Sequence, residues 1–186
     1  MPRLLLVRHC AAGLSGDTST RPLSELGRAQ ADALSAWLQK SWAAVDWIRS
    51  SPYQRAIDTI APFATARGLE IGEDVRLQER SAPFVASTSE HFAATEAAFA
   101  DPTQRLGQSE TALEAQTRGW KTVERALESE FELPLLVTHG QLLSLVLARL
   151  DRSDGIDIWH RMTTPDVFLL EATDLGGFRF ERVWES

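Results

Sequence analysis

The sequence predicts an α/β fold, a three-layer sandwich in which a mainly parallel central sheet carries helices on both faces. Strand-like and helical segments alternate through most of its 186 residues, which is the pattern of that architecture. Two short apolar runs, at 4–7 and 135–137, are typical of strands buried on both faces of a parallel sheet. With 44% hydrophobic residues the chain can bury one sizeable core, so we expect a single domain over 1–186.

Each of the two apolar runs ends in a histidine. Arg8 and His9 follow the first run, and His139 and Gly140 follow the second. Open α/β sheets present reactive side chains at the carboxyl ends of their strands. We therefore expect a functional site where these two strands end.

The first predicted helix follows a loop of small and polar residues at 11–20. It begins at Ser24 and ends near Lys40, with apolar residues recurring at helical spacing, namely Leu26, Ala29, Ala33, Trp37 and Leu38. A short strand is predicted after it, at 45–48.

The second predicted helix has Ser51 as its cap and Pro52 as its first residue, and Gly68 closes it. Arg55 would then lie in the first turn. The amide donors and the positive dipole end of a first turn favour an anion.

The middle of the chain is less regular. After a turn at Gly72, an extended segment at 75–79 would place Leu77 and Glu79 on the same face. The segment 81–108 is predicted to be an insertion that covers the site, with a helix from about 90 to 100 inside it.

The last third of the chain returns to a regular pattern. Thr111 and Glu114 form a capping box for a long helix that carries apolar residues inward, namely Leu113, Trp120, Val123 and Leu127. An apolar helix is predicted at 141–150, directly after His139. Two strands at 167–172 and 178–184 are typical of a hairpin at the edge of the sheet.

Charge and composition limit the partners. The formal net charge of -7 argues against a broad nucleic-acid surface or an anionic-membrane surface. Cys10 is the only cysteine, which excludes an internal disulfide and a cysteine-based metal framework. No apolar run is long enough for a signal peptide or a bilayer span, so we expect a cytoplasmic protein. The sequence leaves the oligomeric state open.

Five side chains are candidates for one pocket, namely Arg8, His9, Arg55, Glu79 and His139. Phosphoryl transfer needs charge compensation at the phosphoryl oxygens and little covalent chemistry from the protein. A guanidinium group can donate two hydrogen bonds at once to such oxygens. An imidazole that nearby cations keep neutral retains the lone pair that attacks phosphorus. A carboxyl group can then give a proton to the departing alkoxide.

Several motifs in order resemble the histidine phosphatase superfamily, also called phosphoglycerate mutase-like. They are Arg8-His9, RPLSELG at 21–27 with Gln30-Ala31, Ser50-Ser51-Pro52 with Arg55-Ala56 and Thr59, LQER at 77–80, GQSE at 107–110 with Arg118, and VTHG at 137–140. The resemblance implies that His9 becomes phosphohistidine, that Arg8, Arg55 and His139 bind the phosphoryl group, and that Glu79 is the general acid. It also implies a reaction without a metal or other cofactor.

The chain departs from the family pattern beside His9. Cys10 stands where the family commonly has glycine, and a cysteine nucleophile is disfavoured because the arginine needed six residues on is Gly16 here. The aromatic segment that often follows the acidic residue is replaced at 81–84. His91 falls in the predicted covering segment, where it could touch substrate.

The sequence thus favours a metal-independent phosphatase of the histidine acid phosphatase type, acting on a small phosphorylated metabolite or a phosphoprotein. Two alternatives stay open. One is a phosphoglycerate mutase, which needs a site closed against water, and 81–108 is short for that purpose. The other is a phosphate-binding module without turnover.

Overall fold

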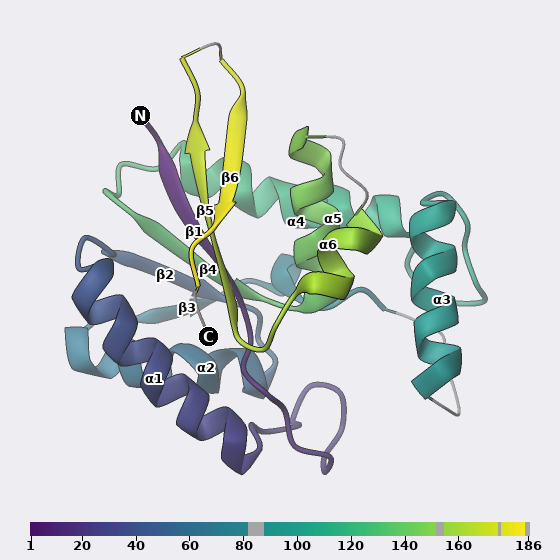
Figure 1. Ribbon diagram of the computed structural model, residues 1–186, viewed down its shortest axis with the longest axis horizontal. Helices are drawn as coiled ribbons and strands as arrows, with labels where there is room; N and C mark the ends of the chain where they lie inside the picture. The colour runs from purple at the N-terminus through teal and green to yellow at the C-terminus, as the bar shows by residue number, and fades with distance from the viewer. Residues whose placement is uncertain (82–87, 152–154, 175, 185–186) are drawn as a thin grey trace.

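The computed structural model describes residues 1–81, 88–151, 155–174 and 176–184. Across these ranges a six-stranded sheet has the order β3-β2-β4-β1-β5-β6 (Figure 1). The strands are β1 (Arg3–Arg8), β2 (Trp47–Ser50), β3 (Ile71–Glu73), β4 (Pro134–Thr138), β5 (Asp166–Ala172) and β6 (Phe178–Arg182). The first four are mutually parallel, whereas β5 pairs antiparallel with β1 and β6 pairs antiparallel with β5. The predicted mainly parallel sheet and its edge hairpin are confirmed.

Helices cover both faces of this sheet, as predicted (Figure 1). They are α1 (Glu25–Ser41), α2 (Gln54–Arg67), α3 (Thr88–Ala100), α4 (Ala112–Leu127), α5 (Gly140–Asp151) and α6 (Gly155–Arg161). Side chains alternate across β1, so Leu5 and Val7 pack in the core under α1 and α2 while Leu4 and Leu6 pack in the core under α4 and α5. The helix α3 stands at the side of the molecule and packs against α6.

The register of the sheet brings three strand ends to one level. Arg8 pairs with Thr138, and Ser50 pairs with Val137. The pairing continues one residue further, because His9 N donates to Thr138 O at 3.0 Å and Ser51 N donates to Val137 O at 2.9 Å. His9, Ser51 and His139 therefore leave neighbouring strands side by side.

Several predicted helix ends are confirmed. Ser24 is the N-cap of α1 and accepts a hydrogen bond from Gly27 N, and Gly68 ends α2 with a left-handed φ of 64°. Thr111 and Glu114 form the predicted capping box of α4. These ends were predictable because each has a local cause, either a cap side chain that bonds a backbone N–H of its own first turn or a glycine that adopts the left-handed conformation.

The start of α2 differs from the prediction. The helix begins at Gln54 with Tyr53 in the cap position, not at Ser51 and Pro52. The Ser51 hydroxyl instead accepts from Tyr53 N at 3.3 Å and contacts His139 Nε2 at 2.8 Å. Ser51 thus belongs to the turn between β2 and α2, where it serves the site. Arg55 is still in the first turn.

The segment 75–79 was also predicted wrongly as extended. Gly72 lies within β3, and Val75–Leu77 form a 3₁₀ helix in which the Asp74 carboxylate accepts from Arg76 N. This local bond competes with an extended backbone.

No helix in the described part of the chain is long and apolar enough to cross a membrane.

Four apolar residues of the predicted apolar helix faces are exposed, namely Leu26, Ala29 and Ala33 of α1 and Leu113 of α4. Leu26 of α1 is 63% exposed and Leu113 of α4 is 45% exposed, whereas Leu38 and Val123 are buried as predicted. Both exposed leucines lie in the first turn of their helix. The strand predicted at 45–48 is observed two residues later, at Trp47–Ser50, because its pairing with β4 begins at Trp47 and Pro134. The short helix α6 was not predicted.

Candidate active site

The two histidines that end β1 and β4 face each other across Arg55. Their ring centroids are 5.0 Å apart. Arg55 Nε donates to His9 Nε2 at 3.2 Å, and Arg55 Nη2 contacts His139 Nδ1 at 3.1 Å. The third arm, Nη1, donates to the carbonyl oxygen of Thr18 in the loop at 2.6 Å. Helix α2 therefore places its first-turn arginine between the ends of the two strands.

These contacts fix the tautomer of each imidazole. A guanidinium only donates, so the ring nitrogens that face Arg55, namely His9 Nε2 and His139 Nδ1, carry lone pairs. His9 Nδ1 then donates to Cys10 O at 2.6 Å, and His139 Nε2 donates to Ser51 Oγ at 2.8 Å. His9 consequently holds the lone pair of Nε2 toward the shared centre.

Burial and neighbouring cations keep both imidazoles neutral. Burial, together with the charges of Arg55, Arg8 and Arg21, lowers the pKa of His9 to about 3, although the hydrogen bond to Cys10 O acts in the opposite direction. Burial also lowers the pKa of His139 well below its ordinary value, together with the charges around it. At neutral pH the lone pair on His9 is therefore available for attack.

Arg8 borders the histidine pair from the other side. Its Nη1 donates to Met162 O at 3.0 Å, while its buried Nε has no hydrogen-bond partner in the described chain. A Cβ placed on Gly140 would lie 3.1 Å from the Arg8 guanidinium carbon. Arg8 thus packs directly over the backbone that follows His139, and a side chain at 140 would crowd it.

Glu79 lies at the amino end of α5. Its carboxylate accepts from the backbone N–H groups of Arg80, Gln141 and Leu142 at 2.9, 3.1 and 2.9 Å. Burial lowers the pKa of Arg8 and Arg55, and the Glu79 charge opposes that shift in both. The carboxylate is therefore within electrostatic reach of both arginines, although the structure shows no direct bond between them.

Arg118 fixes the backbone around Glu79. Arg118 donates to the carbonyl oxygens of Gln78 and Glu79 at 2.8 and 3.2 Å, and its guanidinium pairs with the Glu110 carboxylate at 2.6 Å. This explains the spacing of GQSE and Arg118 in the sequence. Both residues hold the segment that carries Glu79. Burial and nearby charges, that of Arg118 among them, lower the pKa of His139.

Two further arginines belong to this region and were missed as site residues. Among the described residues four buried side-chain nitrogens lack a hydrogen-bond partner, and three of them are Arg8 Nε, Arg21 Nε and Arg80 Nη2. Burial is the largest cause of the lowered pKa of His9, Arg55 and His139. The positive charge of Arg21 also lowers the pKa of all three residues. Arg21 follows the loop at 11–20 within the RPLSELG motif, and that position beside the site was its only signal.

Gly27 and Cys10 shape the loop beside His9. A Cβ on Gly27 would lie 1.9 Å from Ala11 O, so only glycine lets α1 approach this loop. Cys10 is fully buried, and its N–H donates to Thr59 Oγ1 at 2.9 Å. Burial raises the pKa of the Cys10 thiol to about 11, which agrees with a structural cysteine.

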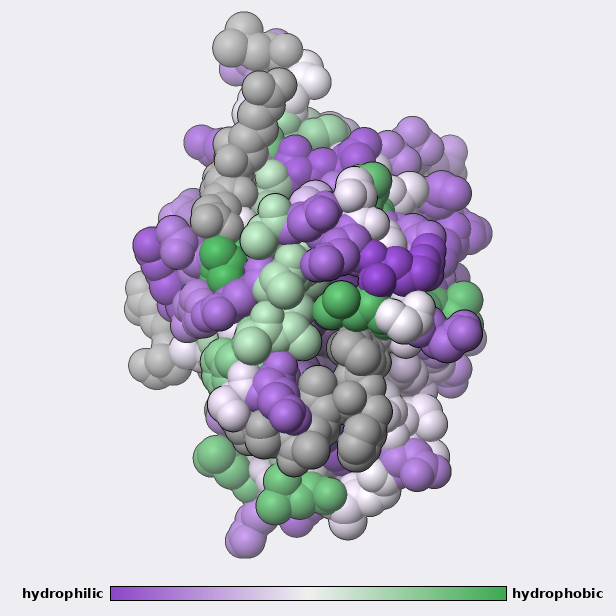
Figure 2. Space-filling model, turned by 90° about the vertical axis from the view of Figure 1, so that its right-hand side faces the viewer, coloured by the Kyte–Doolittle hydropathy of each residue, from purple (hydrophilic) through white to green (hydrophobic). Residues whose placement is uncertain are grey.

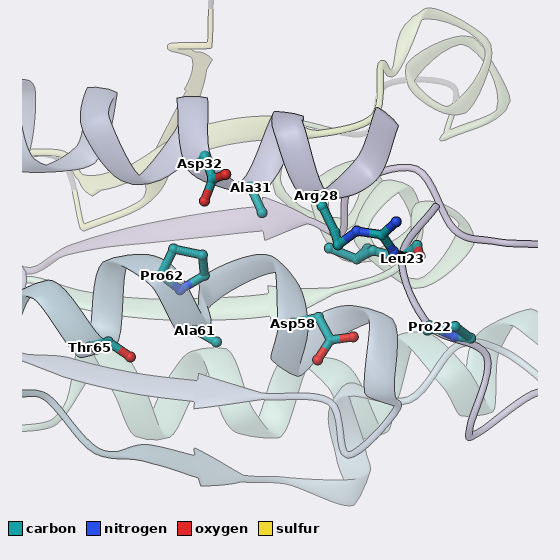
Figure 3. Close-up of a pocket in the computed structure, with 9 residues that line it drawn as sticks. All are labelled: Pro22, Leu23, Arg28, Ala31, Asp32, Asp58, Ala61, Pro62 and Thr65. Atoms are coloured by element: carbon teal, nitrogen blue, oxygen red, sulfur yellow. Dashed lines mark hydrogen bonds between the residues drawn. The ribbon is translucent and has the colours of Figure 1, made fainter. Parts of the chain in front are cut away.

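A cavity of about 470 Å³ lies elsewhere, between α1 and α2 (Figure 3). Arg28, Asp32 and Asp58 stand at its polar edge, and Ala31 and Pro62 belong to its apolar lining. None of the five predicted site residues lines it. The histidine pair therefore lies outside this cavity, and the size of the cavity gives no information about the position of the pair.

Within the described ranges, no three His, Cys, Asp or Glu side chains are grouped to hold a metal ion.

The family described as "Histidine phosphatase superfamily (branch 1)" matches residues 4–183. The chain belongs to this superfamily. The match covers both histidines and the edge hairpin, so it agrees with the motifs found in the sequence. A search of curated proteins found no match.

Solved structures give this branch 1 chain relatives of the same fold. A mycobacterial glucosyl-3-phosphoglycerate phosphatase in complex with inorganic phosphate is 24% identical, with a TM-score of 0.80, over 100% of this chain and 98% of that one. YhfR of Bacillus stearothermophilus is 22% identical, with a TM-score of 0.79, over 99% and 97%. A phosphoserine phosphatase mutant from Entamoeba histolytica in complex with phosphoserine is 16% identical, with a TM-score of 0.77, over 98% and 96%.

Proposed function

We propose that this chain is a metal-independent phosphatase that hydrolyses phosphomonoesters through a phosphohistidine at His9. One observation carries the proposal. The Nε2 lone pair of a neutral, buried imidazole points at the arginine that also touches the second histidine, and two more arginines whose buried Nε is unpaired within the described chain, Arg8 and Arg21, are close enough for their charges to act on His9. A tetrahedral dianion is the group that such a combination of donors and nucleophile fits.

The arginines supply the phosphoryl site. Arg55, with Arg8 and Arg21 beside it, gives N–H donors to the phosphoryl oxygens, and Arg55 Nε moves from His9 Nε2 to an oxygen as the ester binds. Hydrogen bonds to charged groups contribute roughly 1.5 to 3 kcal/mol each, and buried donors left unpaired cost a similar amount. His139 follows the neighbouring strand β4, beside His9 at the end of β1, and its Nε2 is held by Ser51.

The reaction then proceeds in two transfers. His9 Nε2 forms a bond to phosphorus as the ester P–O bond breaks, and Glu79 gives a proton to the departing alkoxide oxygen. In the second transfer Glu79 takes a proton from water, whose oxygen attacks phosphorus and releases His9. The three backbone donors on Glu79 and the Arg118 contacts keep the carboxyl group at one place through both steps.

The substrate class follows the relatives. Two of the related structures are named for small phosphorylated compounds, glucosyl-3-phosphoglycerate and phosphoserine. We extend this class to the present chain, with a phosphoprotein as the remaining alternative. The proposal keeps one domain over 1–186 with 81–108 covering the site; within that segment, 82–87 lie outside the described residues.

A release assay tests the proposal. Wild-type protein, with a chelator present, should release inorganic phosphate from a panel of phosphomonoesters, and His9→Ala should release none. Conversion of 3-phosphoglycerate to 2-phosphoglycerate without release would identify a mutase instead. Phosphate binding without turnover in the wild type would identify a binding module.

The role of Glu79 has its own test. A p-nitrophenolate departs without a proton, whereas an alkoxide needs one. Glu79→Gln should therefore lose far more activity on alkyl phosphates than on p-nitrophenyl phosphate. Equal losses on both esters would remove Glu79 from the acid role and leave the histidine chemistry untouched.

A further inference from the structure

Three aromatic side chains beside the site take no part in the reaction described above. His91 and Phe92 come from α3 and Trp159 comes from α6, and we call them the aromatic rim. The Phe92 and Trp159 ring centroids are 5.1 Å apart, and those of His91 and Trp159 are 6.5 Å apart. Phe92 is 42% exposed and the other two are half-buried, so the rim presents ring surface to solvent.

One side of the aromatic rim is tied to Arg8. Arg8 Nη1 donates to Met162 O at 3.0 Å, and Met162 N donates in turn to Trp159 O at 3.3 Å. Trp159 is therefore one hydrogen-bonded turn of backbone away from a proposed phosphate ligand.

The other side of the rim is tied to Glu79. Gln141 N donates to the Glu79 carboxylate at 3.1 Å, and Gln141 Nε2 donates to Thr95 Oγ1 at 2.9 Å. Thr95 Oγ1 donates to His91 O at 2.8 Å, one turn earlier in α3. These hydrogen bonds end on the backbone carbonyl oxygens of His91 and Trp159, so the helices that carry the rim are joined to Glu79 on one side and to Arg8 on the other.

The figures agree with this placement. In Figure 1 α3 and α6 lie together on the side of the molecule away from α1 and α2. Figure 2 looks onto that side, where a band of mostly weakly apolar surface lies among hydrophilic residues. An apolar surface beside an anion site fits a ligand that has a phosphate at one end and an apolar group at the other.

Packing of α3 on α6 does not need the rim. Further along α3, Phe99 packs so tightly on Gly155 that a Cβ there would lie 2.6 Å from its ring, and Ala98 is buried. Phe92, by contrast, leaves much of its ring uncovered. The rim therefore has apolar area left over after the two helices are joined.

We propose that the aromatic rim binds an aromatic group on the substrate's leaving side, so that the enzyme prefers aromatic phosphomonoesters over aliphatic ones. This inference rests on the proposed function. With the phosphoryl group held by the arginines, the leaving oxygen must face Glu79, and the group attached to it then extends toward the rim. Two aromatic rings in edge-to-face contact gain interaction energy in addition to that of burying apolar surface. This added energy distinguishes an aromatic ring from an aliphatic chain.

The test compares 2-phenylethyl phosphate with n-propyl phosphate. Both release primary alcohols, so their intrinsic reactivity is similar and the ratio of their kcat/KM values reports recognition of the ring. We expect wild type to favour the phenyl ester by about tenfold, and Trp159→Leu to reduce that preference to about threefold or less. Trp159→Phe should restore part of it, and Phe92→Leu should lower it by a smaller factor. The ratio does not depend on the folded fraction of a variant.

Phe131→Leu is the matched control. Phe131 is also an exposed ring, 44% exposed and stacked on Trp47 at the amino end of β2, away from the histidines. It should keep the wild-type ratio. An unchanged ratio in Trp159→Leu and Phe92→Leu, or a wild-type ratio near one, would overturn the inference while hydrolysis itself would still support the proposed function.

Calorimetry separates the two proposals if neither ester is hydrolysed. The matching phosphonates, 2-phenylethylphosphonate and n-propylphosphonate, bind without turnover. Tighter binding of the phenyl compound that disappears in Trp159→Leu would support the rim even though the proposed function had failed. Equal binding of both phosphonates would overturn the rim as well.

Discussion

Removal of the Thr59 hydroxyl should reduce turnover by loosening the backbone that orients His9. Thr59 is 1% exposed, and its Oγ1 accepts from Cys10 N at 2.9 Å and donates to Arg55 O at 2.7 Å. The same Cys10 residue provides the carbonyl that accepts from His9 Nδ1. One hydroxyl thus joins the nucleophile's loop to the helix that carries Arg55, without touching substrate itself.

The size of the effect follows from the bonds that are lost. Thr59→Val keeps the shape but leaves the buried Cys10 N–H unpaired, which costs about 1 to 3 kcal/mol of folding free energy. For a chain of this size that corresponds to a fall of roughly 2 to 12 °C in Tm. A small displacement of a nucleophile lowers turnover steeply, so we expect kcat on p-nitrophenyl phosphate to fall about 10- to 100-fold, with a smaller change in KM.

Two controls make this prediction falsifiable. Thr59→Ser keeps the hydroxyl and should recover most of kcat. Ser35→Ala removes another buried hydroxyl, which accepts from Gln39 within α1, and should change Tm without changing kcat. If Thr59→Val lowers Tm but keeps kcat within about twofold of wild type, the positioning argument is wrong.

Three more predictions concern charge and protonation. Arg21→Met should raise the inhibition constant for inorganic phosphate by about 10-fold or more, whereas Arg28→Met, at the cavity between α1 and α2, should leave it unchanged; competitive inhibition assays compare them. Because burial raises its thiol pKa to about 11, Cys10 should resist iodoacetamide in the folded protein at neutral pH and react after denaturation, as mass spectrometry would show. The folded-state pKa of His9, about 3, lies below its ordinary value of 6.5, so the unfolded chain binds the extra proton between these values and stability falls as pH decreases through that window. Between these pH values, the free energy of unfolding of the wild type, measured with urea, should fall by up to roughly 1.4 kcal/mol per pH unit more than that of His9→Ala. An identical pH dependence in wild type and His9→Ala would count against the buried neutral imidazole.

The parts of the fold that depend on local chemistry could be predicted from the sequence. Apolar runs at 4–7 and 135–137 gave the central strands, and Ser24, Gly68 and the Thr111 capping box gave helix ends. In each case the residues that decide the structure are neighbours along the chain.

Features that depend on distant contacts could not be predicted. Ser51 looks like a helix cap, but its hydroxyl is engaged by His139, 88 residues away. The 3₁₀ turn before Glu79 is held by Arg118, whose partners lie 39 to 42 residues earlier.

The same distinction applies to the site. The sequence placed His9 and His139 at strand ends, and the register of β1 and β4 brings them together. Arg21 lies in the RPLSELG motif and His91 in the predicted covering segment, but Phe92 and Trp159 have no signal in the sequence, because their relevance comes only from what they approach in three dimensions. The roles of the five predicted site residues remain predictions until they are measured.

The most direct measurement of the central claim is rapid-quench trapping of the phosphoryl-enzyme. Wild-type protein mixed with a phosphate ester carrying a labelled phosphoryl group should become labelled within one turnover, and peptide mapping under alkaline conditions should place the phosphoryl group on His9. His9→Ala should carry no label, while Glu79→Gln should still be labelled from p-nitrophenyl phosphate. A wild-type enzyme that releases phosphate at full rate without ever carrying label, or label found on another residue, would contradict the account.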